Sequence, residues 1–405
     1  MAAVRIAGES FGYGCYPAPD RLVFPWQDHR VTAYVLGGYG VLADTPATLV
    51  LEGELRRDLD LAQANELAVT LNTWNQERLG PVLSFRLTDE GRISVRARSS
   101  VQIRVGLSEE QLADAVNQAM ETTRLAVMTL VDDFPQLGYP EELVPEYHSG
   151  DGIAAADEDT SDPRFRADQA ALKTPLPGAI PDAGTGSSPR PAVDAEPGAE
   201  EADTGRLAEF RDLFEYLDQP DDDTGTPPLF PHPGGEQPTV SPRHREPEPE
   251  NSDDNTGEFP YPVTLDRVRA ALTDLGVSRT RGDDEVIVAW VNDVLFGFFL
   301  DNGPSYLVKG HWDPNLDPDR DFMRVFLLCN DWNEGSVNTK AFCHADADGL
   351  QVRVEFTAPV GEGLNDAQLG HNTAVAINQV LHALDSISAD ATGESVVHWP
   401  PRDDN

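Results

Sequence analysis

The chain has 405 residues, of which 40% are hydrophobic, and its 70 acidic side chains outnumber the 30 basic ones to give a net charge of −40. This length predicts two or three domains. So negative a charge repels phosphate backbones and anionic bilayers, which argues against nucleic acid and membrane surfaces as partners. The three cysteines form no CxxC pair, so neither a disulfide framework nor a structural zinc site is indicated.

The expected cellular location follows from the lack of a secretory signal and of membrane-spanning segments. The N-terminus lacks the basic flank and apolar core of a secretory signal, and the longest apolar runs, such as residues 125–131, are too short to cross a bilayer. We therefore expect a cytoplasmic protein in a reducing compartment.

A first domain is predicted over residues 26–137, because alternating apolar residues indicate half-buried strands and the 3.6-residue period indicates helices. Prolines at positions 17, 19 and 25 disfavour a long helix before its first strand. The predicted elements are strands at residues 31–35, 49–51 and 83–87, a helix ending near Trp74 and Asn75, and a helix from Ser108 to about Asp133.

Residues 138–259 are predicted to be a disordered acidic, proline-rich linker. Residues 141–259 hold 29 acidic and 8 basic side chains and 17 of the 32 prolines. Apolar residues are too sparse there to offset the entropy of ordering the chain. Within this linker, one amphipathic island at residues 206–218 is predicted to form a short helix.

A second domain is predicted over residues 260–390. It opens with a helix capped by Thr264, and its middle helix begins at Asp317-Pro318 and ends at Trp332 and Asn333. Its other predicted elements are strands at residues 286–290, 296–300 and 352–356 and a last helix that begins at Asn365.

The two flanking regions contain an internal repeat. Gly40, Asp44 and Gly53 recur 257 residues later as Gly297, Asp301 and Gly310, and Gly91 recurs 258 residues later as Gly349. The sequence NTWN at 72–75 recurs as NDWN at 330–333, also 258 residues later. Landmarks matched over so long a stretch indicate two copies of one domain.

Each copy is predicted to be an α+β domain, an antiparallel sheet packed with helices in the order α-β-β-β-α-β-β-α. The leading helix is expected to be absent from the first copy. We also expect the two copies to pack against each other as an intramolecular pseudo-dimer, because a long flexible linker still holds them at a useful effective concentration.

The island in the linker has the spacing of the leading helix in the second copy. Its apolar residues Leu207, Phe210, Phe214 and Leu217 match that helix's Leu265, Val268, Leu272 and Leu275. A helix this short is marginal in water, so the stripe predicts a docking surface. Two hypotheses stay open: residues 206–218 dock onto the first copy and supply its missing helix, or they bind an external partner.

The NDWN ending of the middle helix, the glycine that closes the third strand and the acidic-glycine turn resemble the YbjN family of bacterial proteins. The second copy matches well, whereas the first has Thr73 in place of Asp331. Two copies with a long acidic insert look like actinobacterial members. The resemblance implies a fold like the small chaperones of type III secretion, a regulatory role and no enzymatic activity.

The candidate interface residues are the tryptophan and asparagine at the end of each middle helix, namely Trp74, Asn75, Trp332 and Asn333. A tryptophan at a helix end can stack on a ligand or anchor an interface, but burial against the sheet explains it as well, while asparagine closes the helix end. The structural interpretation is favoured, since large aromatics at matching places in repeats usually belong to the core.

No catalytic, cofactor-binding or metal-binding residue is predicted. Residues 344–355 imitate a calcium loop, with Asp346, Asp348, Gly349 and Glu355 in suitable positions, but position one is His344. Asp-Gly between alternating segments favours a β-hairpin instead.

The leading functional hypothesis is a non-enzymatic, chaperone-like regulatory module that binds a protein or peptide, through a sheet edge or a helix groove. The alternative is a small-molecule sensor or an enzyme with its site between the two copies.

Overall fold

The computed structural model describes residues 1–37, 47–140, 162–174, 176, 259–277, 279–283, 285–301, 305–346 and 349–399. Both copies of the repeat belong to one compact unit, formed by Met1–Ala195 and Asn255–Asn405.

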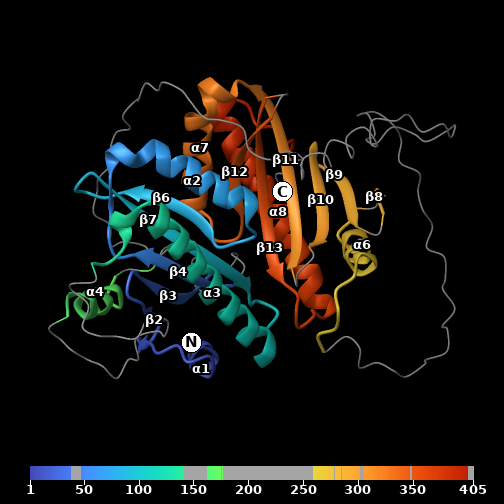
Figure 1. Cartoon of the computed structure of the whole chain (residues 1–405). Helices are drawn as coiled ribbons and strands as arrows, with labels where there is room; N and C mark the ends of the chain where they lie inside the picture. Colours follow the sequence, from blue (N-terminus) through green and yellow to red (C-terminus); the bar gives the residue numbers. More distant parts are fainter. Residues whose placement is uncertain are drawn as a thin grey trace, which may run out of the picture. The chain divides into compact units, whose positions relative to one another are not determined.

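The first copy is an antiparallel sheet with helices on its faces (Figure 1). Its strands follow the order β1-β2-β3-β4-β7-β5, and β6 pairs with β7. The elements are α1 (Ala2–Ser10), β1 (Tyr16–Pro17), β2 (Arg21–Pro25), β3 (His29–Leu36), β4 (Thr48–Leu55), β5 (Leu59–Asp60), η2 (Leu61–Gln63), α2 (Ala64–Glu77), β6 (Val82–Leu87), β7 (Arg92–Gln102), α3 (Glu109–Asp133), η3 (Pro135–Leu137) and α4 (Pro163–Ala171).

The second copy repeats this design, with the antiparallel strand order β12-β13-β11-β10-β9-β8. Its elements are α6 (Leu265–Asp274), β8 (Arg281–Gly282), β9 (Val286–Val291), β10 (Val294–Asp301), β11 (Ser305–Leu316), α7 (Pro318–Gly335), β12 (Lys340–Asp346), β13 (Gly349–Pro359) and α8 (Asp366–Thr392). The predicted α+β class, with two antiparallel sheets packed with helices, is confirmed.

The last helix of each copy begins with a capping box, as its sequence predicts. Ser108 accepts a hydrogen bond from the Gln111 amide at 3.1 Å, and the Gln111 side chain accepts one from the Ser108 amide at 2.9 Å. Asn365 and Gln368 form the same reciprocal pair. Two exposed backbone donors are thereby satisfied at each helix start.

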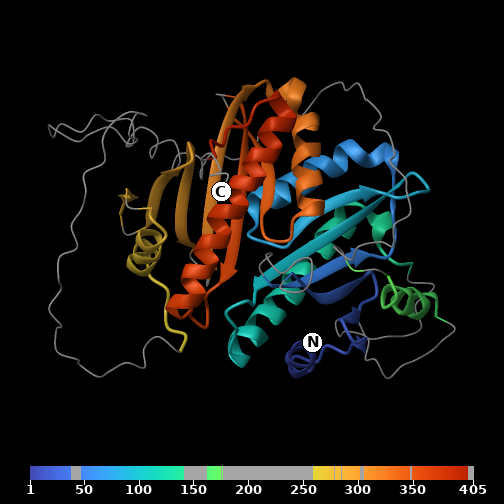
Figure 2. The ribbon, with the colours of Figure 1, turned by 180° about the vertical axis from the view of Figure 1, so that it is seen from behind.

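The repeated glycines in the third strand allow these helices to approach the sheets. A Cβ on Gly53 would lie 2.6 Å from the Thr123 Cγ2 atom of α3, and one on Gly310 would lie 2.3 Å from the Val380 Cγ1 atom of α8. Figure 1 shows α3 across the first sheet, and Figure 2, from behind, shows α8 across the second. The glycines are therefore retained in both copies by packing.

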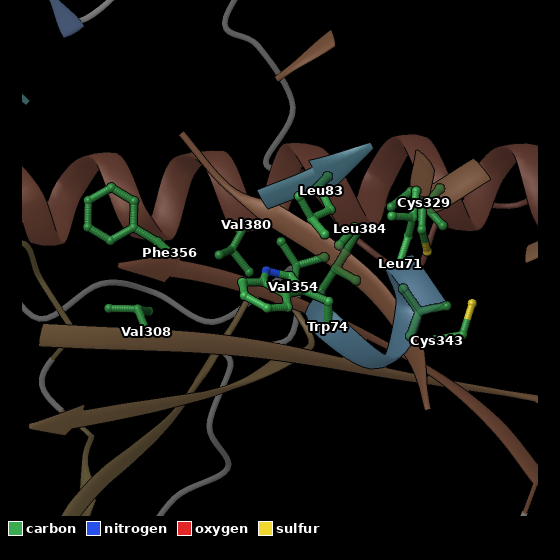
Figure 3. Packing of buried hydrophobic residues seen from close by; sticks show 14 of the residues in the cluster. Leu71, Trp74, Leu83, Val308, Cys329, Cys343, Val354, Phe356, Val380 and Leu384 are labelled. Carbon is green, nitrogen blue, oxygen red and sulfur yellow. The ribbon is translucent and has the colours of Figure 1, made fainter. Parts of the chain in front are cut away.

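One hydrophobic core runs through both copies. Leu71, Trp74 and Leu83 of the first copy belong to the same buried cluster as Val354 and Leu384 of the second (Figure 3). A separate cluster lies under α1. The two copies therefore share buried apolar surface, which is the principal stabilising contribution to their pairing.

The predicted absence of a leading helix in the first copy is wrong. Helix α1 holds that place, and its Val4 and Ala7 are buried with Val116 and Met120 of α3. The prolines that argued against a helix begin at Pro17, after α1 has ended at Ser10. The first copy therefore starts well before residue 26. Apart from the two-residue strands β1, β5 and β8, both copies have the order α-β-β-β-α-β-β-α.

The strand correspondence is also shifted at the start of the repeat. In the sheet order, β10 with Gly297 and Asp301 corresponds to β3, which ends at Leu36, before Gly40. Residues 37–47 connect β3 to β4, whereas only residues 302–304 connect β10 to β11. Gly40 and Asp44 lie outside the described residues.

Part of the predicted disordered linker is a helix packed on the first copy. Asp162 caps α4 and Pro163 occupies its first turn. Its Asp168 forms a buried ion pair with Arg56, at 2.9 and 3.0 Å. The sequence did not predict this helix, because the surrounding composition is acidic and Arg56, which pairs with Asp168, lies 112 residues away in the chain.

The amphipathic island at residues 206–218, with Leu207, Phe210, Phe214 and Leu217, lies outside the described residues, as does most of 138–259. The reason for placing it on the first copy no longer holds, because α1 occupies the position that it was expected to fill.

Candidate functional site

The second asparagine of each repeat motif closes an edge strand within its own copy. Asn75 donates to the Leu83 carbonyl at 2.8 Å and accepts from the Leu83 amide at 2.9 Å. Asn333 makes the same two bonds with Ala341, at 2.9 and 2.8 Å. Both side chains are nearly fully buried. Each asparagine side chain thus bonds the amide and the carbonyl of one strand residue, as the backbone of a neighbouring strand would do.

The first asparagine of each motif reaches across to the other copy. Asn72 donates to the Cys343 carbonyl at 2.8 Å and accepts from the Cys343 amide at 2.9 Å. Asn330 makes the equivalent pair with Phe85, at 2.8 and 2.9 Å. Each copy therefore lends one side chain to the edge strand of the other, which is the reciprocal relation of a two-fold interface.

The two tryptophans lie beside these asparagines and support the same turn. The Trp74 Nε1 atom donates to the Pro81 carbonyl at 2.9 Å, and the Trp332 Nε1 atom donates to the Thr339 hydroxyl at 3.0 Å. Trp74 is 7% exposed and Trp332 is half-buried. Burial and hydrogen bonding of both indole rings are the features of core residues.

A second reciprocal contact joins the starts of the last helices. The Gln111 Nε2 atom donates to the Gly363 carbonyl at 2.7 Å, and the Gln368 Nε2 atom donates to the Gly106 carbonyl at 2.9 Å. The two glutamine side chains also bond to each other, at 3.0 and 3.1 Å. The capping glutamines therefore have a second role in the contact between the copies.

The C-terminal end of each middle helix receives a cation from the other copy. Arg98 donates to the carbonyls of Asn333 and Ser336 at the end of α7, at 2.9 and 2.8 Å. Lys340 donates to the Arg78 carbonyl that follows α2. Cations are favourable there because the last carbonyls of a helix carry partial negative charge.

The ion pairs behind these cations have opposite polarity in the two copies. Glu52 of β4 faces Arg98 of β7 at 2.7 Å, whereas Lys309 of β11 faces Glu355 of β13 at 3.0 Å. Lys340 also pairs with Glu355 at 2.8 Å. At equivalent strand positions, the first copy therefore has an acidic and then a basic residue, and the second copy has the reverse.

The intramolecular pairing that the repeat predicts is present among the described residues, and it closes the edges of β6 and β12. Aromatic contact adds to it, since the Phe85 and Phe326 rings stack with centroids 6.2 Å apart. An edge strand whose backbone groups are already bonded cannot add a further strand.

The opposite edge of the second sheet is more open. Val286 accepts a hydrogen bond from the Asp283 amide at 3.2 Å. Alternation then directs the backbone groups of Trp290 to the same side. In the part of the chain that the structure describes, β8 pairs with β9 only at Ile287 and Val288. Trp290, two residues further on, is 49% exposed.

The corresponding edge of the first sheet is protected. β1 covers β2 and contains Pro17, which has no amide hydrogen to donate. Arg21 of β2 also donates to the Ala171 carbonyl of α4 at 3.3 Å. Position 290 is therefore the better candidate for contact with an extended partner.

The first copy also contains a cavity of about 380 Å³ between its sheet and α4. Its polar lining includes four arginines, together with Glu54, Asp58, Thr88, Ser94 and Tyr139. The arginines are Arg30, Arg56, Arg86 and Arg164.

The calcium-loop imitation is a β-hairpin, as predicted. Asp346 pairs with Gly349 in the register of β12 and β13. Glu355 is buried in ion pairs with Lys309 and Lys340. Burial alone would raise its carboxyl pKa, but the two ammonium groups lower that pKa to about 2. Among the described residues, no group of three histidines, cysteines or acids could hold a metal ion.

A cavity between the copies is too small for a substrate. It holds about 20 Å³ and is lined by Gln111 of the first copy and Gly363 and Asn372 of the second. That volume accommodates about one water molecule. Within the described residues it offers no support for a site of the kind the alternative hypothesis placed there.

Sequence reasoning missed Asn72, Asn330 and the two glutamines as interface residues. The available signal was that these residues recur at the repeat offset. A polar residue that is merely exposed in one copy has no reason to recur in the other. The four arginines left no local signal, since they come from β3, β6, α4 and the turn after β4.

The fold and the reciprocal contacts define a class of α+β protein in which two copies of one domain pair within a single chain. Residues 17–127 and 264–388 match the family described as "YbjN: Putative bacterial sensory transduction regulator". These two matches cover more than half of the chain, and the protein therefore belongs to the YbjN family. The predicted resemblance is confirmed; the actinobacterial type stays a prediction.

Among solved structures, the chain is similar to the one titled "Crystal structure of YbjN, a putative transcription regulator from E. coli". The two are 19% identical with a TM-score of 0.27, and the match covers 32% of this chain and 94% of that one. No curated protein matches the chain. Within the described residues, every helix is too short or too polar to span a bilayer.

Proposed function

We propose that this protein is a non-enzymatic, chaperone-like regulatory module that binds an extended peptide segment of a protein partner. The observation that supports it is the unequal treatment of the sheet edges. β6 and β12 are closed by asparagines, and β2 is covered by β1. On its outer side, β9 is bonded among the described residues only from Val286 to Val288.

Strand addition at β9 would use the backbone groups of Trp290 for affinity and its exposed indole as an anchor. Main-chain hydrogen bonds give such complexes affinity, while side-chain contacts give them specificity. Tryptophan is enriched among residues that dominate interface energies. The remaining features agree, because both copies share one buried core and β9 lies outside their reciprocal contacts.

Photo-crosslinking in the native host tests this function. A photoreactive amino acid at position 290 of the full chain should capture a specific polypeptide, whereas the same group at Val69, exposed to a similar 42% on α2, should not. In a separate pull-down of that polypeptide by the full chain without the photoreactive group, Trp290→Pro, which removes the backbone donor, should abolish capture. Trp290→Ala, which keeps the donor, should weaken it less.

The proposal would be contradicted by identical crosslinks from positions 290 and 69, or by capture that survives Trp290→Pro. Circular dichroism of the proline variant should match that of the wild type, because the substitution lies at a sheet edge.

A further inference from the structure

The cavity of the first copy is a place where positive charge gathers in a strongly negative protein. Four guanidinium groups and two carboxylates line its 380 Å³. The aspartates that pair with two of the arginines, Asp168 with Arg56 and Asp162 with Arg164, are not part of the lining. With Arg56 and Arg164 neutralised by these aspartates, Arg30 and Arg86 are the lining arginines left for a ligand, together with Glu54 and Asp58.

Arg56 and Arg164 are held in place by ion pairs. Arg56 makes a bidentate pair with Asp168, and both side chains are at most 3% exposed. Arg164 pairs with Asp162 at 2.6 Å and lies over the Tyr139 ring at 5.4 Å. These contacts join α4 to Arg56 and to the segment after α3 without using the other two arginines.

Arg30 and Arg86 share a single carboxylate. Both pair with Glu54, Arg86 at 3.3 Å, so this triad has one positive charge in excess. The Arg30 side chain lines the cavity and is 18% exposed. The Arg86 side chain is 47% exposed at the cavity. Both arginines therefore keep donors for an additional anion.

We propose that this cavity binds a phosphate monoester, with Arg30 and Arg86 as its principal donors. The site is independent of the open edge at Trp290, which belongs to the other copy.

The chemistry of the lining selects phosphate over a simple carboxylate. A phosphate monoester presents three terminal oxygens and up to two negative charges, which suits the two forked guanidinium groups of Arg30 and Arg86. The hydroxyl groups of Thr88 and Ser94 lie in the same lining and can donate further hydrogen bonds. The volume limits the rest of the ligand to a small organic group or one side chain.

Isothermal titration of the full chain at low ionic strength tests the site. Glucose 6-phosphate and a phosphoserine peptide serve as the two probes, with glucose as the uncharged control. At least one phosphorylated probe should bind, and its affinity should fall as salt is added, because screening weakens charge attraction. Tighter binding of the sugar phosphate would identify a small-molecule ligand, and tighter binding of the peptide a phosphorylated partner.

Arg86→Ala should weaken binding at least tenfold, and Arg86→Lys should weaken it less, since lysine keeps the charge but loses the fork. Arg124→Ala on α3 is the matched control, because its 44% exposed side chain pairs with Glu121 and is not part of the lining. Its affinity should equal that of the wild type.

A second readout does not depend on the variants folding. Phenylglyoxal modifies accessible arginines, and the bound probe should protect Arg86 while leaving Arg124 reactive. The proposal is overturned if neither probe binds at 10 mM, or if Arg86→Ala binds as well as the wild type.

Discussion

Replacing Asn330 with alanine removes one half of the exchanged asparagine contacts. Asn330 is 3% exposed and makes two hydrogen bonds to the backbone of Phe85 in the other copy, at 2.8 and 2.9 Å. The alanine variant leaves the Phe85 amide and carbonyl groups without these partners inside the contact between the copies.

The expected cost follows from those two groups. A hydrogen bond contributes about 1 kcal/mol net, and each buried polar group left unsatisfied costs about 1–3 kcal/mol. With partial access of water to the vacated space, we expect Asn330→Ala to lower the free energy of unfolding by about 2–4 kcal/mol. Total stability is usually about 5–15 kcal/mol, so the change is easily measured.

Urea unfolding followed by circular dichroism and tryptophan fluorescence measures this cost. Asn72→Ala should cost a similar amount, because it removes the equivalent pair at Cys343. Asn65→Ala, at an exposed asparagine of α2, should change stability by less than about 0.5 kcal/mol. Equal, small effects of Asn330→Ala and Asn65→Ala would refute the reasoning.

Two further outcomes concern the second copy. The pKa of Glu355 is lowered from 4.5 to about 2, so its ionised form stabilises the fold above pH 4.5 and that contribution is lost as the pH falls toward 2. Glu355→Gln should therefore flatten the pH dependence of urea unfolding between pH 4.5 and 2, and an unchanged slope would show that Lys340 and Glu355 are not coupled. Gly310→Ala should lower stability by about 1–3 kcal/mol, because its new methyl group meets Val380. Restored stability in Gly310→Ala with Val380→Ala would confirm the clash in thermal melts, and a neutral single variant would contradict it.

Local patterns predicted most of the second copy. Thr264, Asp317 and Asn365 cap their helices as expected, because capping depends on residues within one turn. Alternation likewise located β9 and β13. These signals work where the sequence neighbours of a residue are also its structural neighbours.

Long-range contacts explain what the sequence did not predict. Helix α1 is short and is stabilised by packing of Val4 and Ala7 on α3, more than a hundred residues later. Helix α4 depends on the Arg56–Asp168 pair. The open edge at Trp290 could not be predicted, since it depends on where β8 stops pairing.

Cleaving the connection between the copies tests their pairing most directly. A protease site inserted in residues 181–258 would separate the chain into two halves, whose association sedimentation velocity and native mass spectrometry can measure. We predict a 1:1 complex that persists at micromolar concentration and dissociates when Asn72→Ala and Asn330→Ala are combined. Two halves that sediment independently after cleavage of the unmutated chain would contradict the reciprocal interface.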